Sequence, residues 1–144
     1  MKYLIALAAL AATSLLIAAA GDGGAATYVD HEKVAAQFVK GGPIAKGPDF
    51  SVSANKRTGP GQVEVHDKET DIFHVMDGDA TLITGGKMVG GKQTKQDQWL
   101  GTSIEGGSTY HLSKGDVVTV PAGTPHWFKE TKGISYYTVK VIKP

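Results

Sequence analysis

Two short segments of the chain hold the residues whose types and spacing suit metal chemistry. In the segment Gln62-Val63-Glu64-Val65-His66, polar and apolar residues alternate. Side chains of a β-strand point to opposite faces in turn, so Glu64 and His66 share one face. A carboxylate and an imidazole that converge in this way are two potential ligands for a metal ion.

The second segment brings a histidine onto a strand from a tight turn. An apolar strand expected at residues 117–120 ends in a turn that contains Pro121 and Gly123. His126 follows this turn and begins the next strand. We therefore expect the turn to present His126 as a third potential ligand.

Acidic and aromatic residues occupy related positions on the neighbouring strands. Asp71 opens a strand after a short turn, and Phe73 shares its face. On the strand that begins at His126, Phe128 and Glu130 share the face of the histidine. These residues are candidates for a common pocket.

The two segments resemble the two sequence motifs of the cupins. The second motif reads glycine, five residues, proline, any residue, glycine, two residues and histidine. It is matched at Gly115, Pro121, Gly123 and His126. Many cupins end this motif with an asparagine four residues after the histidine, where this chain has Glu130.

The first cupin motif is matched with substitutions. It reads histidine, any residue, histidine, three or four residues, glutamate, six residues and glycine. Gly78 sets the register, which puts Asp71 at the glutamate position, His66 at the second histidine and Glu64 at the first. Two of the family's four usual ligands are thus replaced by other residue types that bind metals.

The resemblance covers roughly residues 50 to 142 and implies an all-β fold with a small-molecule pocket. This fold is the double-stranded β-helix, a jelly-roll barrel that is often a homodimer. An oxygen and nitrogen donor set suits a divalent Fe, Mn, Ni or Zn ion. The expected ligands are Glu64, His66, Asp71 and His126, and the expected pocket-lining residues are Arg57, Phe73, Phe128 and Glu130.

A barrel without a metal ion is the alternative to this centre. Glu64 then pairs with a cation such as Arg57, and the histidines form hydrogen bonds in the pocket. Buried carboxylates need such a partner, because two that converge without one repel each other.

Composition excludes several classes of protein. A chain of 144 residues suits one domain with one hydrophobic core. Its 15 basic and 14 acidic residues provide no basic field for binding nucleic acid. Because the chain has no cysteine, it has no disulfide, thiolate zinc site or cysteine nucleophile.

The N-terminal residues have the pattern of a secretory signal peptide. Lys2 precedes an apolar run at residues 3–20, which ends in three alanines before Gly21. Cleavage after Ala20 predicts a periplasmic or secreted protein with no stable membrane span. The alternative is a membrane anchor, because about 18 apolar residues is near the lower limit for a span.

The remaining pattern divides the chain into a short helix and a series of strands. Asp30 is a helix N-cap, and Gly41 is placed to end that helix. We expect residues 21–49 to form an N-terminal segment with this helix, and residues 50–144 to form the barrel. Asp77-Gly78 predicts a hairpin turn, and residues 85–107 predict a long hairpin and covering loop.

These observations predict an exported single-domain cupin with a divalent-metal site. One functional hypothesis is a metalloenzyme acting on a small oxygenated compound. The other is a non-catalytic module that binds a small ligand or a metal ion, because one jelly roll supports many activities.

Overall fold

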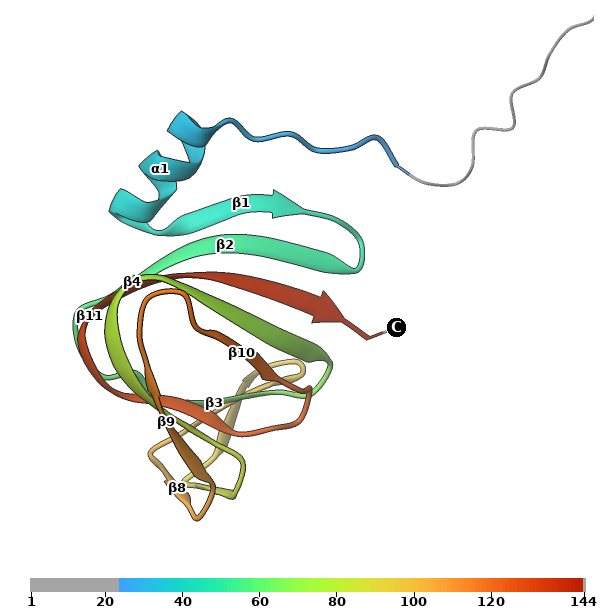
Figure 1. Cartoon of the computed structure of the whole chain (residues 1–144). Helices are drawn as coiled ribbons and strands as arrows, with labels where there is room; N and C mark the ends of the chain where they lie inside the picture. The colour runs from blue at the N-terminus through green and yellow to red at the C-terminus, as the bar shows by residue number, and fades with distance from the viewer. Residues whose placement is uncertain (1–23, 144) are drawn as a thin grey trace, which may run out of the picture.

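The computed structural model describes residues 24–143, which form one helix and a β-barrel (Figure 1). The predicted all-β class with a short N-terminal helix is confirmed. The elements are α1 (His31–Lys40), β1 (Gly42–Lys46), β2 (Phe50–Arg57), β3 (Val63–His66), β4 (Glu69–Thr84), β5 (Lys87–Val89), β6 (Lys92–Lys95), β7 (Gln98–Gly101), β8 (Ser103–Glu105), β9 (Ser108–Leu112), β10 (Val117–Val120) and β11 (His126–Ile142).

The two long strands, β4 and β11, form the frame of the barrel. They pair antiparallel over almost their whole length. The second half of β11 also pairs with β2, and β1 extends that side. The first half of β4 pairs with β10 and its second half with β9. Each long strand therefore belongs to both faces of the barrel.

Both long strands bend at a glycine. Gly78 in β4 and Gly133 in β11 have φ angles of +79° and +83°, and the pairing register shifts beside them. A Cβ atom on Gly78 would lie 1.6 Å from the carbonyl oxygen of Gly133. The predicted hairpin at Asp77-Gly78 is therefore wrong: the chain bends there within one strand, because its partner strand bends at the same place.

Helix α1 packs on the outside of the barrel. Asp30 accepts a hydrogen bond from the Lys33 amide at 2.9 Å, so the predicted N-cap is confirmed. Gly41 ends the helix with a φ of 73°. Phe38 meets Tyr137 of β11 edge-on, with ring centroids 4.8 Å apart. The helix thus covers part of the outer face that β2 and β11 form.

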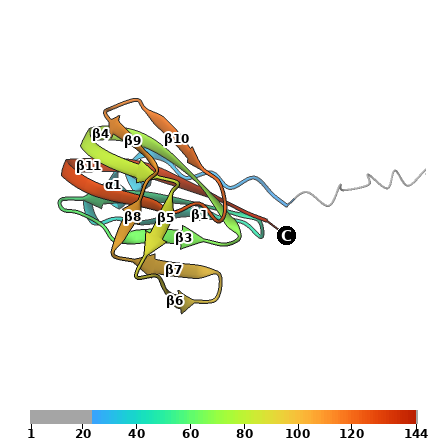
Figure 2. The same ribbon diagram turned by 90° about the horizontal axis from the view of Figure 1, so that it is seen from below.

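Residues 85–107 form short strands where the sequence predicted a hairpin and covering loop. Strands β5 and β8 pair with each other in a small separate sheet. Strand β7 pairs with both β3 and β6, so the β6–β7 pair extends the main sheet beside β3 (Figure 2).

The interior of the barrel is divided into an apolar end and a polar end. The apolar end is a cluster of buried side chains from β4, β9, β10 and β11. The polar end is a cavity reached from β2, β3, β4 and β11. The apolar cluster comprises Phe73, Val75, Ala80, Leu82, Leu112, Val120, Phe128, Ile134 and Tyr136.

The signal peptide predicted at residues 1–20 lies outside the described residues. Within residues 24–143, no helix has the length and apolar character needed to cross a membrane.

Candidate metal centre

The polar cavity has a volume of about 110 Å³ and contains every predicted metal ligand. Its walls come from strands that are distant in sequence, so the barrel fold assembles it. The residues that line it are Ser53, Asn55, Arg57, Gln62, Glu64, His66, Asp71, Phe73, His126, Phe128, Tyr136, Thr138 and Lys140.

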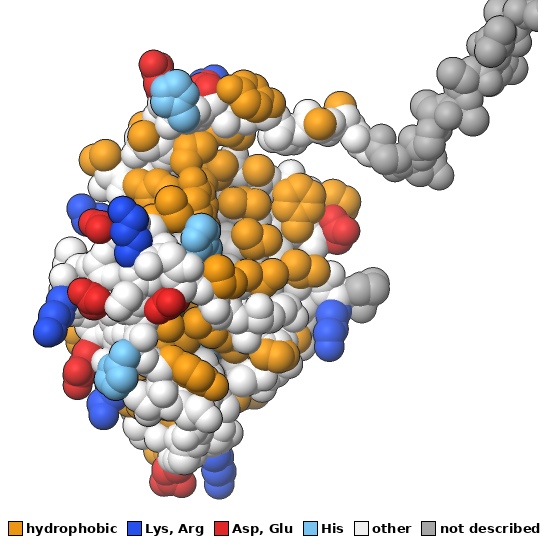
Figure 3. All heavy atoms as spheres, in the orientation of Figure 1, with side chains coloured by type: hydrophobic (Ala, Val, Ile, Leu, Met, Phe, Trp, Pro, Cys, Tyr) orange, Lys and Arg blue, Asp and Glu red, His pale blue; other side chains and the backbone are white. Residues whose placement is uncertain are grey.

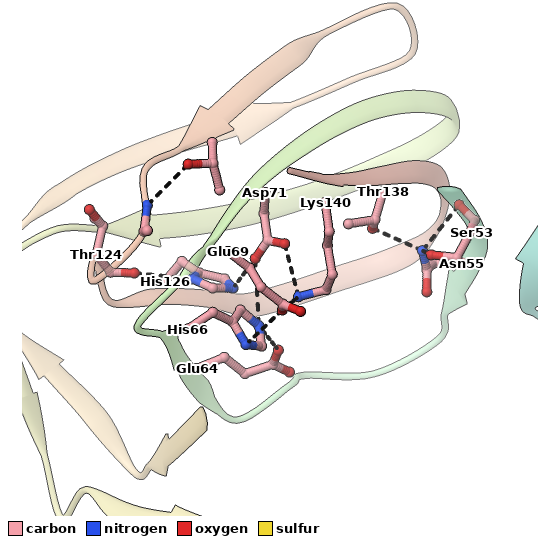
Figure 4. A network of polar contacts seen from close by, with 12 residues as sticks. Ser53, Asn55, Glu64, His66, Glu69, Asp71, Thr124, His126, Thr138 and Lys140 are labelled. Carbon is pink, nitrogen blue, oxygen red and sulfur yellow. Dashed lines mark hydrogen bonds and ion pairs between the residues drawn. The ribbon is translucent and has the colours of Figure 1, made fainter. Parts of the chain in front are cut away.

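Four side chains point their ligand atoms at one region of this cavity (Figure 4). His66 Nε2 lies 3.4 Å from Glu64 Oε2 and 3.5 Å from Asp71 Oδ2. His126 Nε2 lies 3.4 Å from the same Asp71 oxygen. Glu64, His66 and His126 form one group able to hold a metal ion. A second group joins His66 and Asp71 to Glu69, which sequence analysis did not single out.

Strand pairing explains why these side chains converge. His126 and Glu64 lie directly opposite each other where β11 meets β3. The amide of Gly123 donates a hydrogen bond of 2.8 Å to the carbonyl oxygen of His66. This bond fixes the turn before His126 against β3. The glycine and histidine of the second motif are therefore joined to the first motif through the backbone.

The remaining ring nitrogen of each histidine faces an acceptor. His126 Nδ1 lies 3.2 Å from the carbonyl oxygen of Thr124, which can only accept, so this nitrogen carries the proton. His66 Nδ1 lies 3.5 Å from Glu69 Oε2. Partners of this kind fix the orientation of metal-binding histidines and leave Nε2 free to ligate. Thr124 and Glu69 thus act as the outer partners of the site.

The donor set fits a divalent first-row ion. Two ligand atoms about 2.1 Å from one ion, at a tetrahedral angle, are about 3.4 Å apart. The distances from His66 and His126 Nε2 to the nearby carboxylate oxygens are 3.4 to 3.5 Å. Two imidazoles and two carboxylates suit Fe, Mn, Ni or Zn. These three spacings and the chemistry of the residues would allow a metal ion to be held here.

Lys140 places a positive charge beside the centre. Its Nζ lies 2.6 Å from Glu69 Oε2 and 3.0 Å from Asp71 Oδ1 (Figure 4). Asp71 is 2% exposed, so its charge needs a partner. Burial lowers the pKa of Lys140, but Asp71 and Glu69 raise it above the usual value, so the ammonium stays charged. Because Lys140 engages Oδ1 of Asp71, the other oxygen, Oδ2, is the one that faces the histidines.

Two pKa shifts keep candidate ligands in the form that binds a metal. Burial raises the pKa of Glu64, but its contacts with His66, His126 and Arg57 together lower it to about 2. Burial lowers the pKa of His126, against the opposing effect of Asp71. Glu64 is therefore a carboxylate and His126 a neutral imidazole at neutral pH, as metal ligation requires.

Arg57 lies at the edge of the cavity between an acid and aromatic rings. Its Nε donates a hydrogen bond of 2.8 Å to the Tyr136 hydroxyl, and its Nη2 lies 3.4 Å from Glu64 Oε1. Its guanidinium carbon is 5.4 Å from the centroid of the Phe128 ring. The contact between Arg57 and Glu64 is the one that sequence analysis proposed for a barrel without metal.

The predicted pocket residues separate into two groups. Arg57, Phe73 and Phe128 line the cavity, whereas Glu130 does not. Glu130 is exposed and lies beside a different surface cavity. The register of β11 against β4 shifts between Phe128 and Glu130, so strict alternation fails there. This bulge corrects the expectation for Glu130.

Several cavity residues were missed because they lie on a face that looks ordinary in the sequence. In β11, residues two positions apart line the cavity, and so do residues two positions apart in β2. The alternation itself was visible, but nothing in it says which face turns inward. The missed residues are Ser53, Asn55, Gln62, Tyr136, Thr138 and Lys140.

Comparison with known proteins supports the fold. Neither a protein-family model nor a curated protein matches the sequence. Among solved structures, the BH2720 protein of Bacillus halodurans superposes with a TM-score of 0.59 at 14% identity, over 85% of this chain and 86% of that one. At these identities the likeness concerns the fold alone.

Two further structures name this fold. The cupin domain of Schizosaccharomyces pombe Cnp3 matches with a TM-score of 0.53 at 14% identity, over 72% of this chain and 60% of that one. A Klebsiella pneumoniae protein with a double-stranded β-helix domain matches with a TM-score of 0.50 at 16% identity, over 69% of each chain. The chain therefore has the cupin fold, as its two motifs indicated.

Proposed function

We propose that the protein is a metalloenzyme that binds a divalent ion and acts on a small oxygenated compound. The observation that carries this proposal is that Glu64, His66 and His126 hold ligand atoms within 4.8 Å of one another in a lined cavity, and that Asp71 Oδ2 lies within 3.5 Å of both histidines. The cavity, at about 110 Å³, is below the usual range of about 300 to 1,000 Å³ for drug-sized ligands. The substrate is therefore small.

The side chains around the centre have separable roles. When bound, a divalent ion supplies Lewis-acid polarisation of a substrate oxygen. Phe73 and Phe128 close the inner end of the cavity against the apolar core and exclude water there. Burial raises the pKa of Tyr136, and its oxygen accepts from Arg57, so its own proton can be donated to a substrate oxygen.

Elemental analysis of the purified mature protein tests the metal site. We expect about one equivalent of a divalent metal in the wild-type protein. The double variant His66→Ala/His126→Ala should lose it, because two of the four ligands are removed. A matched control is His74→Ala/His111→Ala, which removes two exposed histidines outside the cavity.

The result that contradicts the metal site is a wild-type protein with less than about a tenth of an equivalent after reloading. Equal metal content in the wild type and in the His66→Ala/His126→Ala variant would also contradict it. Loss of metal in the control pair alone would place the ion elsewhere.

A non-catalytic binding module is the second candidate function. The observation that favours it is that two cations, Arg57 and Lys140, pair with the carboxylates of the cavity. These pairs balance much of the negative charge, so the charged residues have a role that does not require catalysis. Dioxygen consumption or product formation with candidate substrates supports the enzyme. Recovery of unchanged ligand after prolonged incubation supports the module.

We also propose that the protein is exported and forms a homodimer. Lys2 and the apolar run at residues 3–20 support export to the periplasm or medium, and the N-terminal mass of the secreted protein tests cleavage after Ala20. The homodimer is supported by exposed apolar side chains on the outer face of the barrel, among them Val117 and Val141.

A further inference from the structure

Arg57 is held rigidly yet has unused hydrogen-bond donors. A guanidinium group has five N–H donors in a planar fork. In Arg57, Nε donates to Tyr136 and Nη2 contacts Glu64, at 2.8 and 3.4 Å. Among the described residues, Nη1 has no hydrogen-bond partner. The side chain is therefore oriented by its neighbours while part of its fork remains available.

A glycine leaves the space that this arrangement requires. A Cβ atom at position 61 would lie 2.8 Å from Arg57 Nη1. Gly61 itself is fixed: its amide donates to the Phe128 carbonyl oxygen at 2.9 Å, and its own carbonyl oxygen accepts from Trp127 Nε1 at 2.8 Å. Any larger residue at position 61 would displace the free end of the guanidinium group.

The charge of the site favours an anion once a metal ion is bound. Three carboxylates and two cations, Arg57 and Lys140, interact around the centre, which leaves one net negative charge. A divalent ion reverses this to one net positive charge, with both histidines neutral as ligands must be. Lys140 already contacts two carboxylates. Arg57 contacts one carboxylate, that of Glu64, at the longer distance of 3.4 Å, so it is the cation better able to bind an added anion.

We propose that Arg57 determines substrate specificity by binding the carboxylate of a small organic acid whose other oxygens reach the metal centre. The planar fork of arginine matches a carboxylate, and both groups face the same small cavity. Phe128 beneath the guanidinium plane and Gly61 beside Nη1 keep the fork in place. This inference rests on the proposed metalloenzyme and specifies its substrate class.

Binding of malonate, compared with its neutral analogue malonamide, tests the proposal. We expect metal-loaded wild-type protein to bind malonate at least about tenfold more tightly than malonamide in a ligand-observed NMR titration. Arg57→Met should weaken malonate binding and reduce this preference, because only the attraction of the metal centre for a carboxylate remains, while metal content stays the same. Gly61→Ala should weaken malonate binding through displacement of Arg57. Lys56→Met, which removes an exposed charge from the same strand, should bind malonate as the wild type does.

The proposal is overturned if Arg57→Met binds malonate as tightly as the wild type, or if the wild type does not distinguish malonate from malonamide. Circular dichroism melts show whether each variant is folded. If Arg57→Met does not fold, malonate binding by Gly61→Ala is compared with that of the wild type instead. A wild-type protein that retains no metal contradicts the proposed function and, with it, this inference, because the metal-free site carries one net negative charge. A wild-type protein that retains the metal but does not prefer malonate contradicts this inference alone.

Discussion

Lys140 gives the centre an internal cation within reach of two carboxylates. It contacts Asp71, whose side chain is almost fully buried, and Glu69, which also faces His66. An ion that binds Asp71 Oδ2 would therefore share this carboxylate with an ammonium group on the other oxygen. Stability of the metal-free protein and affinity for the metal consequently depend on the same residue, in opposite directions.

Lys140→Met should separate these two effects. Without metal, the variant should lose about 1–3 kcal/mol of stability, because the buried Asp71 loses its ion-pair partner. Its affinity for a divalent ion should rise, because one positive charge near the ligands is gone. Urea unfolding in the presence of a chelator and metal competition titrations measure the two quantities. Lys132→Met, an exposed lysine of the same strand, should change neither.

A Lys140→Met variant that behaves like the wild type in both measurements would contradict this role for Lys140. A variant with unchanged stability and unchanged metal affinity would show that its two contacts contribute nothing measurable in solution.

The candidate metal ligands could be located from the sequence because each residue type is chemically distinctive and the motif spacing sets their register. The cavity positions of Tyr136 and Lys140 could not be predicted. The sequence of their strand does not show which of its two faces turns into the barrel. In the last part of β11, Tyr136, Thr138 and Lys140 turn into the cavity, and Tyr137 turns outward beneath α1. This is the reverse of the usual pattern, in which polar residues face solvent.

At the scale of elements, the bend shared by β4 and β11 allows one pair of strands to build both faces of the barrel. Gly78 and Gly133 meet at this bend, so the two strands change direction together. A sequence pattern of two short strands with Asp-Gly between them is also typical of a hairpin. A hairpin turn and a bend within one strand differ only in what lies opposite the glycine. Here that is Gly133, a residue distant in sequence, so local sequence does not reveal it.

Gly78→Ala should destabilise the protein by about 2–4 kcal/mol, because the new methyl group adds a clash to an unfavourable backbone conformation. Gly85→Ala is the matched control: its φ of +77° is nearly the same, but a Cβ atom there meets nothing within 4 Å. It should cost only about 1–2 kcal/mol. Denaturant unfolding measures both, and equal losses would rule out the close approach to Gly133.

At the scale of the whole molecule, hydrophobic side chains gather on the outer face of the barrel beneath α1 (Figure 3). Val117 of β10 pairs with His74 of β4, which pairs in turn with Tyr137 of β11, so these residues form one row on this face. Val117 is 61% exposed and Val141 is 44% exposed. Exposed apolar surface of this kind is typical of an interface between proteins.

Val117→Glu should therefore shift a homodimer toward the monomer, because a charge would be buried without a partner in the interface. Light scattering coupled to size-exclusion chromatography measures the mass across a dilution series. Val39→Glu, at an exposed valine of α1, is the matched control and should leave the mass unchanged. A wild-type protein that is monomeric at every concentration would exclude the homodimer.

The pairing of β11 also affects the order of folding. This strand pairs with β2, β3 and β4, and it contributes His126 and Lys140 to the centre. Neither side of the barrel can close until residues 126–142 have joined strands that precede them by about forty residues or more. Such non-local pairing slows folding to milliseconds or seconds in all-β domains. The candidate metal site can therefore form only after this long-range pairing is in place.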